Sequence, residues 1–307
     1  MNDAAWAHEL PRTRGELLSR VYANPVLHRL VPTPVAVSLA LLRGELEWRV
    51  LPSRRRLALR AAGLAAPVDA DECEVRELAR AHLRETCVQT ELSWRPWDAR
   101  RMPIDGLARI GESAGRGGVI LALLHMGPMY SLFHALAARG VPICIPTAQQ
   151  RGMSRFTGAD AHWVREQFIA LERMGHRLVP RGGAYDVLAE ALREGRSCGL
   201  AWDVPGPVAV ELLGRRAWVR SGIVRLAIET GVPILPAYTV RDGLGQRAVI
   251  EEPVARDSLD DAQALTAALA SRMDAIVTAY RAQVHVRSRL RIFEPPPGPE
   301  PLAGSRP

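Results

Sequence analysis

The pattern of apolar and polar residues changes at about residue 115. Before that point, residues 34–64 and 69–92 are rich in Leu, Ala, Arg and Glu and are predicted to be helical, with Asp69 or Asp71 suited to cap the second stretch. From residue 118, short apolar runs alternate with helical stretches of roughly 10–14 residues. This alternation is typical of an α/β fold. We therefore predict a largely parallel central sheet flanked by helices, with a helical N-terminal region.

The predicted elements of the second part can be given by residue range. The strands are expected at 118–124, 141–148, 176–181, 197–205, 232–240 and 246–254, the last returning as a hairpin. The helices are expected at 129–140, 163–175, 184–195, 221–231 and 260–282. We divide the chain into a helical region at 1–115 packed on the core, an α/β core at 116–293 and a disordered, Pro-rich tail at 294–307.

Two side chains follow predicted strands at the places where α/β proteins collect their sites. His125 comes directly after the apolar run 118–124, and Gly127 and Pro128 form a turn before the next helix. A histidine there is suited to act as a general base, or equally to bond a loop carbonyl. Asp203 lies at the end of the predicted strand 197–205 and precedes a Pro-Gly turn. Its carboxylate is suited either to catalysis or to bonding the N–H groups of that turn.

The order of these motifs resembles the superfamily of glycerolipid and lipid A late acyltransferases, which includes lauroyl and myristoyl acyltransferases. The strand–His125–turn–helix unit resembles that family's first motif. The stretch WDVPGPVAVELLGRRAWVRSGIVRLAIETGVPILPAYTVRDG at 202–243 places Asp203, the pair Leu213-Gly214 and the pair Ser221-Gly222 where the family has comparable residues. The segment VPTPVAVSLALLRGELEWRVLPSRRR at 31–56 is also similar. The resemblance implies transfer of an acyl group from a thioester on acyl carrier protein or CoA to a hydroxyl or amine, with His125 as general base. It also implies oxyanion stabilisation by backbone N–H groups between Gly214 and Ser221, or by an arginine.

One position departs from the family motif. The family has an Asp or Glu five residues after the histidine, whereas this chain has Tyr130. A tyrosine hydroxyl can bond an imidazole but carries no negative charge to stabilise imidazolium. Three interpretations follow: an acceptor more reactive than an alcohol, an acid borrowed from Asp203, Glu211 or Glu166, or loss of acyl transfer with retained binding. The carboxyl end departs as well, with His285 but no Trp before the basic-aromatic run.

The net positive charge of the chain favours anionic ligands but does not identify which one is bound. The chain has a net charge of +7, and because it lacks lysine its 40 basic residues are all arginines, as a GC-rich genome would favour. The positive excess suits phosphate, acidic carriers, RNA or anionic lipid. Phosphate of the donor or acceptor is expected near Arg151 or Arg181. The alternatives are therefore an aminoacyl-tRNA-dependent transferase in specialised metabolism and a non-catalytic lipid- or carrier-binding protein. No cofactor or metal site is expected.

The most apolar window, 30–42, is shorter than the roughly 20 residues that a membrane-spanning helix needs. We predict that it packs as an ordinary helix, the alternative being a helix that lies in a membrane interface. The four cysteines form no CxxC pair, and no signal peptide is visible. These features favour the reducing cytoplasm, either free or peripheral at an anionic inner membrane.

Overall fold

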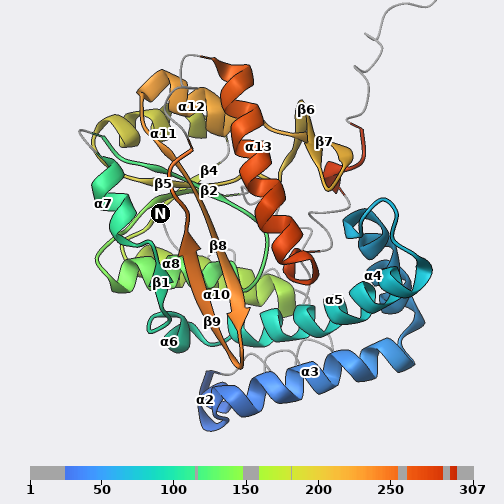
Figure 1. Ribbon diagram of the computed structural model, residues 1–307. Helices are drawn as coiled ribbons and strands as arrows, with labels where there is room; N and C mark the ends of the chain where they lie inside the picture. Colours follow the sequence, from blue (N-terminus) through green and yellow to red (C-terminus); the bar gives the residue numbers. More distant parts are fainter. Residues whose placement is uncertain are drawn as a thin grey trace, which may run out of the picture.

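A mostly parallel sheet forms the centre of the molecule (Figure 1). The computed structural model describes residues 25–114, 117–147, 159–180, 182–254, 261–285 and 291–295. Within these residues the sheet has seven strands in the order β1-β9-β8-β2-β5-β3-β4. Their bounds are β1 Ile104–Asp105, β2 Ile120–Leu123, β3 Cys144–Thr147, β4 Arg177–Pro180, β5 Cys198–Ala201, β8 Ile234–Asp242 and β9 Gly245–Ile250. Strands β2, β3, β4, β5 and β8 are parallel and β9 returns antiparallel to β8, which confirms the predicted α/β class and the terminal hairpin.

Helices cover both faces of the sheet and form two apolar cores. On one face lie α11 Ala184–Arg193, α12 Gly222–Thr230 and α13 Ala262–Ala279, and on the other lie α7 Ala108–Ala114, α8 Tyr130–Ala138 and α10 Ala159–Arg173. All four residues of β2 are buried because the strand lies between these two layers. Burial on both faces explains why residues 118–124 form a continuous apolar run and do not alternate with polar residues.

The N-terminal region is helical, as predicted, but divided differently. Its helices are α2 Pro25–Leu30, α3 Thr33–Val50, α4 Pro52–Ala65, α5 Glu72–Ser93 and α6 Pro96–Ala99. The expected single stretch 34–64 is two helices because Pro52 starts a new one. Asp71 caps α5 in a reciprocal capping box with Glu74, so Asp71 is the capping residue of the two candidates.

Sequence analysis missed a separate hairpin between β5 and α12. Strands β6 Pro205–Leu212 and β7 Arg215–Val219 pair antiparallel outside the main sheet and lie beside α13 (Figure 1). The turn has Leu213 at φ 55° and Gly214 at φ 68°, the positive angles that a two-residue hairpin turn requires. The Leu-Gly pair of the family motif is therefore a hairpin turn.

We predicted that residues 30–42 pack as an ordinary helix, and in α3 only one face of this segment is buried. Val37 and Ala40 are buried, whereas Leu39 and Leu42 are more than half exposed. No helix in the described ranges is long and apolar enough to cross a membrane.

Candidate active site

The register of two neighbouring strands brings His125 and Asp203 together. Leu123 of β2 is paired with Ala201 of β5, and each candidate lies two residues beyond its own member of that pair. Parallel strands in register end at the same level, so the two side chains meet at the carboxyl edge of the sheet. The His125 imidazole Nδ1 lies 2.6 Å from Asp203 Oδ1.

The Asp203 carboxylate binds both the side chain and the backbone of His125. Its Oδ1 accepts from Nδ1–H, while Oδ2 accepts from the His125 backbone N–H at 3.1 Å. Because the carboxylate can only accept, this pairing assigns the proton of the neutral ring to Nδ1 and leaves Nε2 as the basic nitrogen. The Asp203 side chain is 4% exposed and the His125 side chain 28% exposed. The acid is thus shielded while the base is open to a reactant.

The loop after His125 fits closely against β8. Gly127 has φ 54°, and a Cβ at this position would lie 2.0 Å from the Thr239 carbonyl oxygen. Only glycine fits both the angle and the approach. This contact fixes the turn that leads from His125 into α8.

The segment after α13 holds the same loop from the other side. The Gly127 N–H donates to the Gln283 carbonyl at 3.0 Å, and the His285 N–H donates to the His125 carbonyl at 2.8 Å. The His285 ring also bonds the Gly127 carbonyl through Nε2 at 2.9 Å, and its centroid is 6.5 Å from that of His125. His285 therefore positions the His125 loop.

Helix α5 in turn holds this segment in place. His82 Nδ1–H donates to the Ala282 carbonyl at 2.9 Å and Gln89 Nε2 donates to the Gln283 carbonyl at 2.6 Å. Gln283 Oε1 accepts from the Arg241 N–H at 2.7 Å, and the Arg241 guanidinium forms a two-pronged ion pair with the buried Glu85. The N-terminal helices thus support the site through residues that sequence analysis did not select, because these partners lie between 42 and 200 positions apart in the chain.

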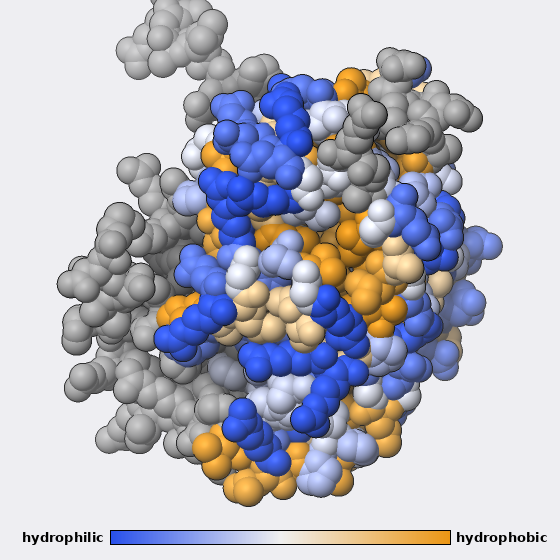
Figure 2. Space-filling view, turned by 90° about the vertical axis from the view of Figure 1, so that its left-hand side faces the viewer, coloured by the Kyte–Doolittle hydropathy of each residue, from blue (hydrophilic) through white to orange (hydrophobic). Residues whose placement is uncertain are grey.

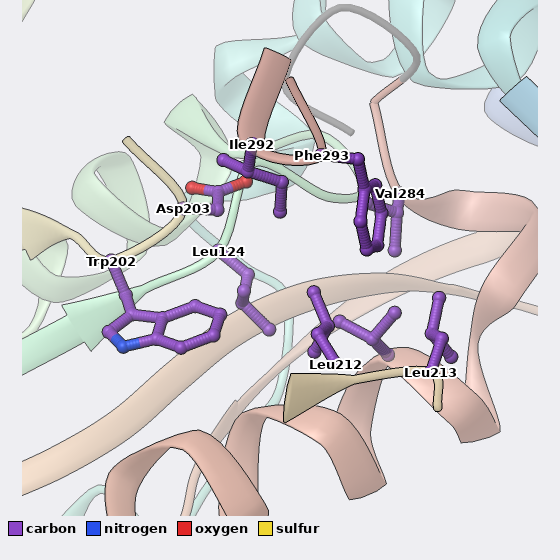
Figure 3. Close-up of a pocket in the computed structure, with 9 residues that line it drawn as sticks. Leu124, Trp202, Asp203, Leu212, Leu213, Val284, Ile292 and Phe293 are labelled. Atoms are coloured by element: carbon purple, nitrogen blue, oxygen red, sulfur yellow. The ribbon is translucent and has the colours of Figure 1, made fainter. Parts of the chain in front are cut away.

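An apolar pocket lies next to Asp203 (Figure 3). Leu212 and Leu213 of the hairpin face Ile292 and Phe293 across it, and Trp202 and Leu124 also line it. Leu213 is held in its unusual backbone conformation by its N–H bond to Asp274 Oδ1 at 2.6 Å. The cavity has a volume of about 10 Å³, the space of one water molecule. The hairpin therefore contributes to the surroundings of the His125–Asp203 pair.

Tyr130 occupies the first turn of α8 in an aromatic environment. Its ring lies edge-on to Phe133 at a centroid distance of 6.2 Å and tilted against Phe168 at 6.3 Å. Burial raises the pKa of the Tyr130 hydroxyl to about 12, so this group is neutral at pH 7. A contact between Tyr130 and His125 stays a prediction.

The remaining candidates are scattered. Gly214 lies in the turn before β7, and Ser221 lies between β7 and α12. Their part in binding an oxyanion stays a prediction. Glu211 on β6 and Glu166 on α10 are exposed. Arg151 and Arg181 lie outside the described residues.

Comparison with known proteins identifies the family. The family model described as bacterial lipid A biosynthesis acyltransferase matches residues 97–287, which is more than half of the chain. The chain belongs to this family. It is also 32% identical over 217 residues to a phosphatidylinositol mannoside acyltransferase of Mycolicibacterium smegmatis. That alignment covers 63% of this chain and 66% of the relative, just under two thirds of its length. The matched region of the lipid A acyltransferase family includes β2, His125, Asp203 and the hairpin.

Proposed function

We propose that the chain transfers an acyl group from a thioester donor, on acyl carrier protein or CoA, to a hydroxyl or amine acceptor, with His125 as general base. The observation that carries the proposal is the 2.6 Å pair of His125 Nδ1 and Asp203 Oδ1, with Nε2 left as the basic nitrogen. Nε2 takes the proton from the acceptor's hydroxyl or amine while the acceptor's oxygen or nitrogen attacks the thioester carbonyl. The tetrahedral intermediate then breaks its C–S bond, and the imidazolium returns the proton to the leaving thiolate.

Asp203 is proposed to replace the acid that the family has at position 130. Its carboxylate fixes the imidazole tautomer and stabilises the imidazolium formed during transfer. Among the three interpretations of Tyr130, the position of Asp203 favours the borrowed acid. The Tyr130 hydroxyl, whose pKa is raised by burial, stays a neutral group in this proposal.

The apolar pocket does not by itself identify the donor or the acceptor. It is lined by Leu124, Leu212, Leu213 and Phe293 together with Asp203, so it lies beside the proposed reacting pair. Its volume of about 10 Å³ has room for one water molecule and none for an acyl chain, so the support for an acyl substrate comes from the family.

The acceptor proposed first is a hydroxyl of a glycolipid. The support is the similarity to the mycobacterial relative, which is named a phosphatidylinositol mannoside acyltransferase. The four free cysteines fit a reducing compartment, so we propose that the reaction takes place in the cytoplasm or at its membrane face. Phosphate of the donor or acceptor is proposed to bind Arg151 or Arg181.

Donor turnover tests this proposal. Purified protein is incubated separately with acyl-CoA, acyl carrier protein and aminoacyl-tRNA, and release of the carrier is followed for wild type and for His125→Ala. We expect slow release from one thioester donor, reduced roughly 10²–10⁴-fold in the variant. His125→Gln, which keeps much of the shape without a base of comparable strength, is expected to be equally slow.

Two results would redirect the proposal. Release from aminoacyl-tRNA alone, with a steep dependence on salt, would assign the chain to the tRNA-dependent class. Equal release by wild type and His125→Ala, or no release from any donor, would contradict acyl transfer at His125 and favour a binding function.

A further inference from the structure

Two apolar side chains near the carboxyl end of the chain cover the pocket beside Asp203. Ile292 is 3% exposed and Phe293 is partly buried, although both belong to the short described segment 291–295. Figure 3 shows the two side chains pointing toward the pocket from the side opposite the β6–β7 hairpin. The cavity of about 10 Å³ is the space left between them and the hairpin, so these side chains take the room in which a larger ligand could lie.

The other walls of the pocket belong to the packed interior of the molecule. They come from β6, α13 and the residues that follow β2 and β5. Leu124 directly precedes His125 and Trp202 directly precedes Asp203, and both belong to the apolar core that α11, α12 and α13 cover. With residues 291–295 moved aside, these walls would form an apolar groove that adjoins the proposed catalytic pair.

The segment 291–295 is held mainly by these apolar contacts. Within the described residues its one side-chain ion pair joins Glu294 to Arg60 of α4 at 3.5 Å, and the two side chains are 61% and 68% exposed. An ion pair so exposed contributes little to stability. No strand pairs with the segment in the described part of the chain. An apolar ligand of similar shape would therefore make the same contacts that Ile292 and Phe293 make.

Few large apolar side chains are exposed on the α/β core. Among the described residues after 70, the exposed ones are Ile228 on α12 and Leu244 on the β8–β9 turn, at 38% and 44%. Figure 2 shows one face of the molecule, on which charged residues border the apolar patches. Because an acyl chain gains its binding energy from apolar surface removed from water, the pocket beside Asp203 is the better match to such a chain.

We propose that residues 291–295 form a displaceable lid, and that Ile292 and Phe293 occupy the place that the donor's acyl chain takes when it binds. The proposal rests on the proposed acyl transfer, which requires an acyl chain close to His125 and Asp203. The donor then competes with the protein's own lid, and its apparent affinity is lowered in proportion to the fraction of molecules whose lid is open. A short acyl group makes too few apolar contacts to replace both side chains, so the lid favours donors with long chains.

Fluorine NMR tests the lid with a donor mimic that cannot be cleaved. The full chain, whose 4 phenylalanines are replaced by 4-fluorophenylalanine, is titrated with the thioether S-decyl-N-acetylcysteamine or with its S-ethyl analogue. The signal of Phe293 is assigned from the spectrum of Phe293→Leu. We expect the decyl compound to move this signal to the position of a solvent-exposed ring, and the ethyl compound to leave it in place. An unchanged Phe293 signal at saturation with the decyl compound would overturn the proposal.

The affinity of the decyl compound in variants gives a second measurement. Ile292→Ala/Phe293→Ala shortens both lid side chains and leaves the opposite walls intact, so we expect it to bind the compound at least roughly tenfold more tightly than wild type. A loss of folding would weaken binding, so tighter binding cannot arise from it. Ile228→Ala, the matched control on α12, should bind like wild type. Equal or weaker binding by the double variant, or no binding by either protein, would overturn the lid.

His125→Ala separates the lid from the chemistry. Because the thioether is not cleaved, this variant should bind the decyl compound and release Phe293 like wild type. Release of the lid in a wild-type protein that turns over no donor would contradict the proposed acyl transfer and still support the lid. Turnover of a long-chain donor while the lid stays in place would support acyl transfer and overturn the lid.

Discussion

His125 is fixed at three of its polar groups, and its side chain is 28% exposed. Asp203 binds the ring Nδ1 and the backbone N–H, while the His285 N–H binds the carbonyl. A base held in one tautomer and one orientation loses little entropy when it meets a substrate. At the scale of the residue, the proposed activity depends on this fixation as much as on the basicity of the imidazole.

Tyr130 gives the sharpest test of which group supports the base. Because Asp203 already binds Nδ1 and the Tyr130 ring packs on Phe133 and Phe168, Tyr130→Phe is expected to keep donor cleavage within roughly threefold of wild type. Tyr130→Ala should lower stability by about 3–5 kcal/mol through loss of the ring. Urea unfolding and donor cleavage are measured on both variants. A loss of a hundredfold or more in Tyr130→Phe would mean that the hydroxyl, and not only Asp203, supports the base.

The sequence limits the acids that could contact His125 to a few candidates but does not show that Asp203 is the one. Asp203 was the candidate at the end of an apolar run, but Glu211 and Glu166 stayed open as partners of His125 because a sequence does not show which elements are neighbours. The register that pairs Leu123 with Ala201 decides in favour of Asp203 as the contact of His125. Gln283 and His285 bond Gly127 across more than 150 residues, so the sequence, which marks His285 only through its place near the carboxyl end, does not show that they hold the His125 loop.

At the scale of elements, the site depends on close approaches between separate segments. The His125 loop touches β8 at Thr239 and the segment 281–285 through backbone bonds. The main strands were predictable because their burial on both faces leaves continuous apolar runs. The β6–β7 hairpin was not predicted. The residues of β6 alternate between exposed and partly buried, and they lie within a motif that was interpreted as a turn. The break between α3 and α4 has a sequence signal in Pro52, which starts the second helix.

Gly127→Ala tests the approach to β8. A Cβ at this site meets the Thr239 carbonyl at 2.0 Å and the backbone has φ 54°, so we expect a loss of about 2–4 kcal/mol in the free energy of unfolding. Gly140→Ala is the matched control: its φ is 74°, but the space around a Cβ is open, so strain alone should cost about 1–2 kcal/mol. Urea unfolding of both variants measures the difference. Equal losses would contradict the tight approach at Gly127.

Arg241→Gln tests the support that α5 gives to the site. The substitution leaves the buried Glu85 carboxylate without its two-pronged partner, so we expect a loss of about 2–4 kcal/mol in stability and slower donor cleavage. Arg193→Gln breaks an exposed pair with Glu229 and should change stability by less than about 1 kcal/mol. Both values come from urea unfolding. A rate like that of wild type in Arg241→Gln would show that the segment at 281–285 keeps its position without α5.

At the scale of the whole molecule, buried histidines make stability depend on pH. Burial lowers the pKa of His176 below its ordinary value of 6.5, and its Nδ1 accepts from the Ile143 N–H while Nε2–H donates to the Phe133 carbonyl. Burial likewise lowers the pKa of His134. Below about pH 6.5 the unfolded chain takes up protons that the folded chain refuses, so stability falls as the pH falls.

Thermal unfolding at pH 7.5 and 5.5 measures this effect. We expect a lower Tm at pH 5.5 for wild type. Because glutamine can both donate and accept without titrating, His176→Gln is expected to reduce the fall. An unchanged fall in that variant would show that His176 does not contribute to the acid sensitivity.

The most direct test of the central claim is the rate of donor cleavage in Asp203→Asn. The amide keeps the shape of the carboxylate but removes the charge that would stabilise the His125 imidazolium. The account predicts a loss of roughly 10²–10⁴-fold in the folded variant, with Asp242→Asn, an exposed acid at the end of β8, behaving like wild type. Because the amide offers one acceptor in place of the two that His125 uses, a lower Tm is also expected for Asp203→Asn. A rate within roughly threefold of wild type in Asp203→Asn would contradict the His125–Asp203 pair as the catalytic unit.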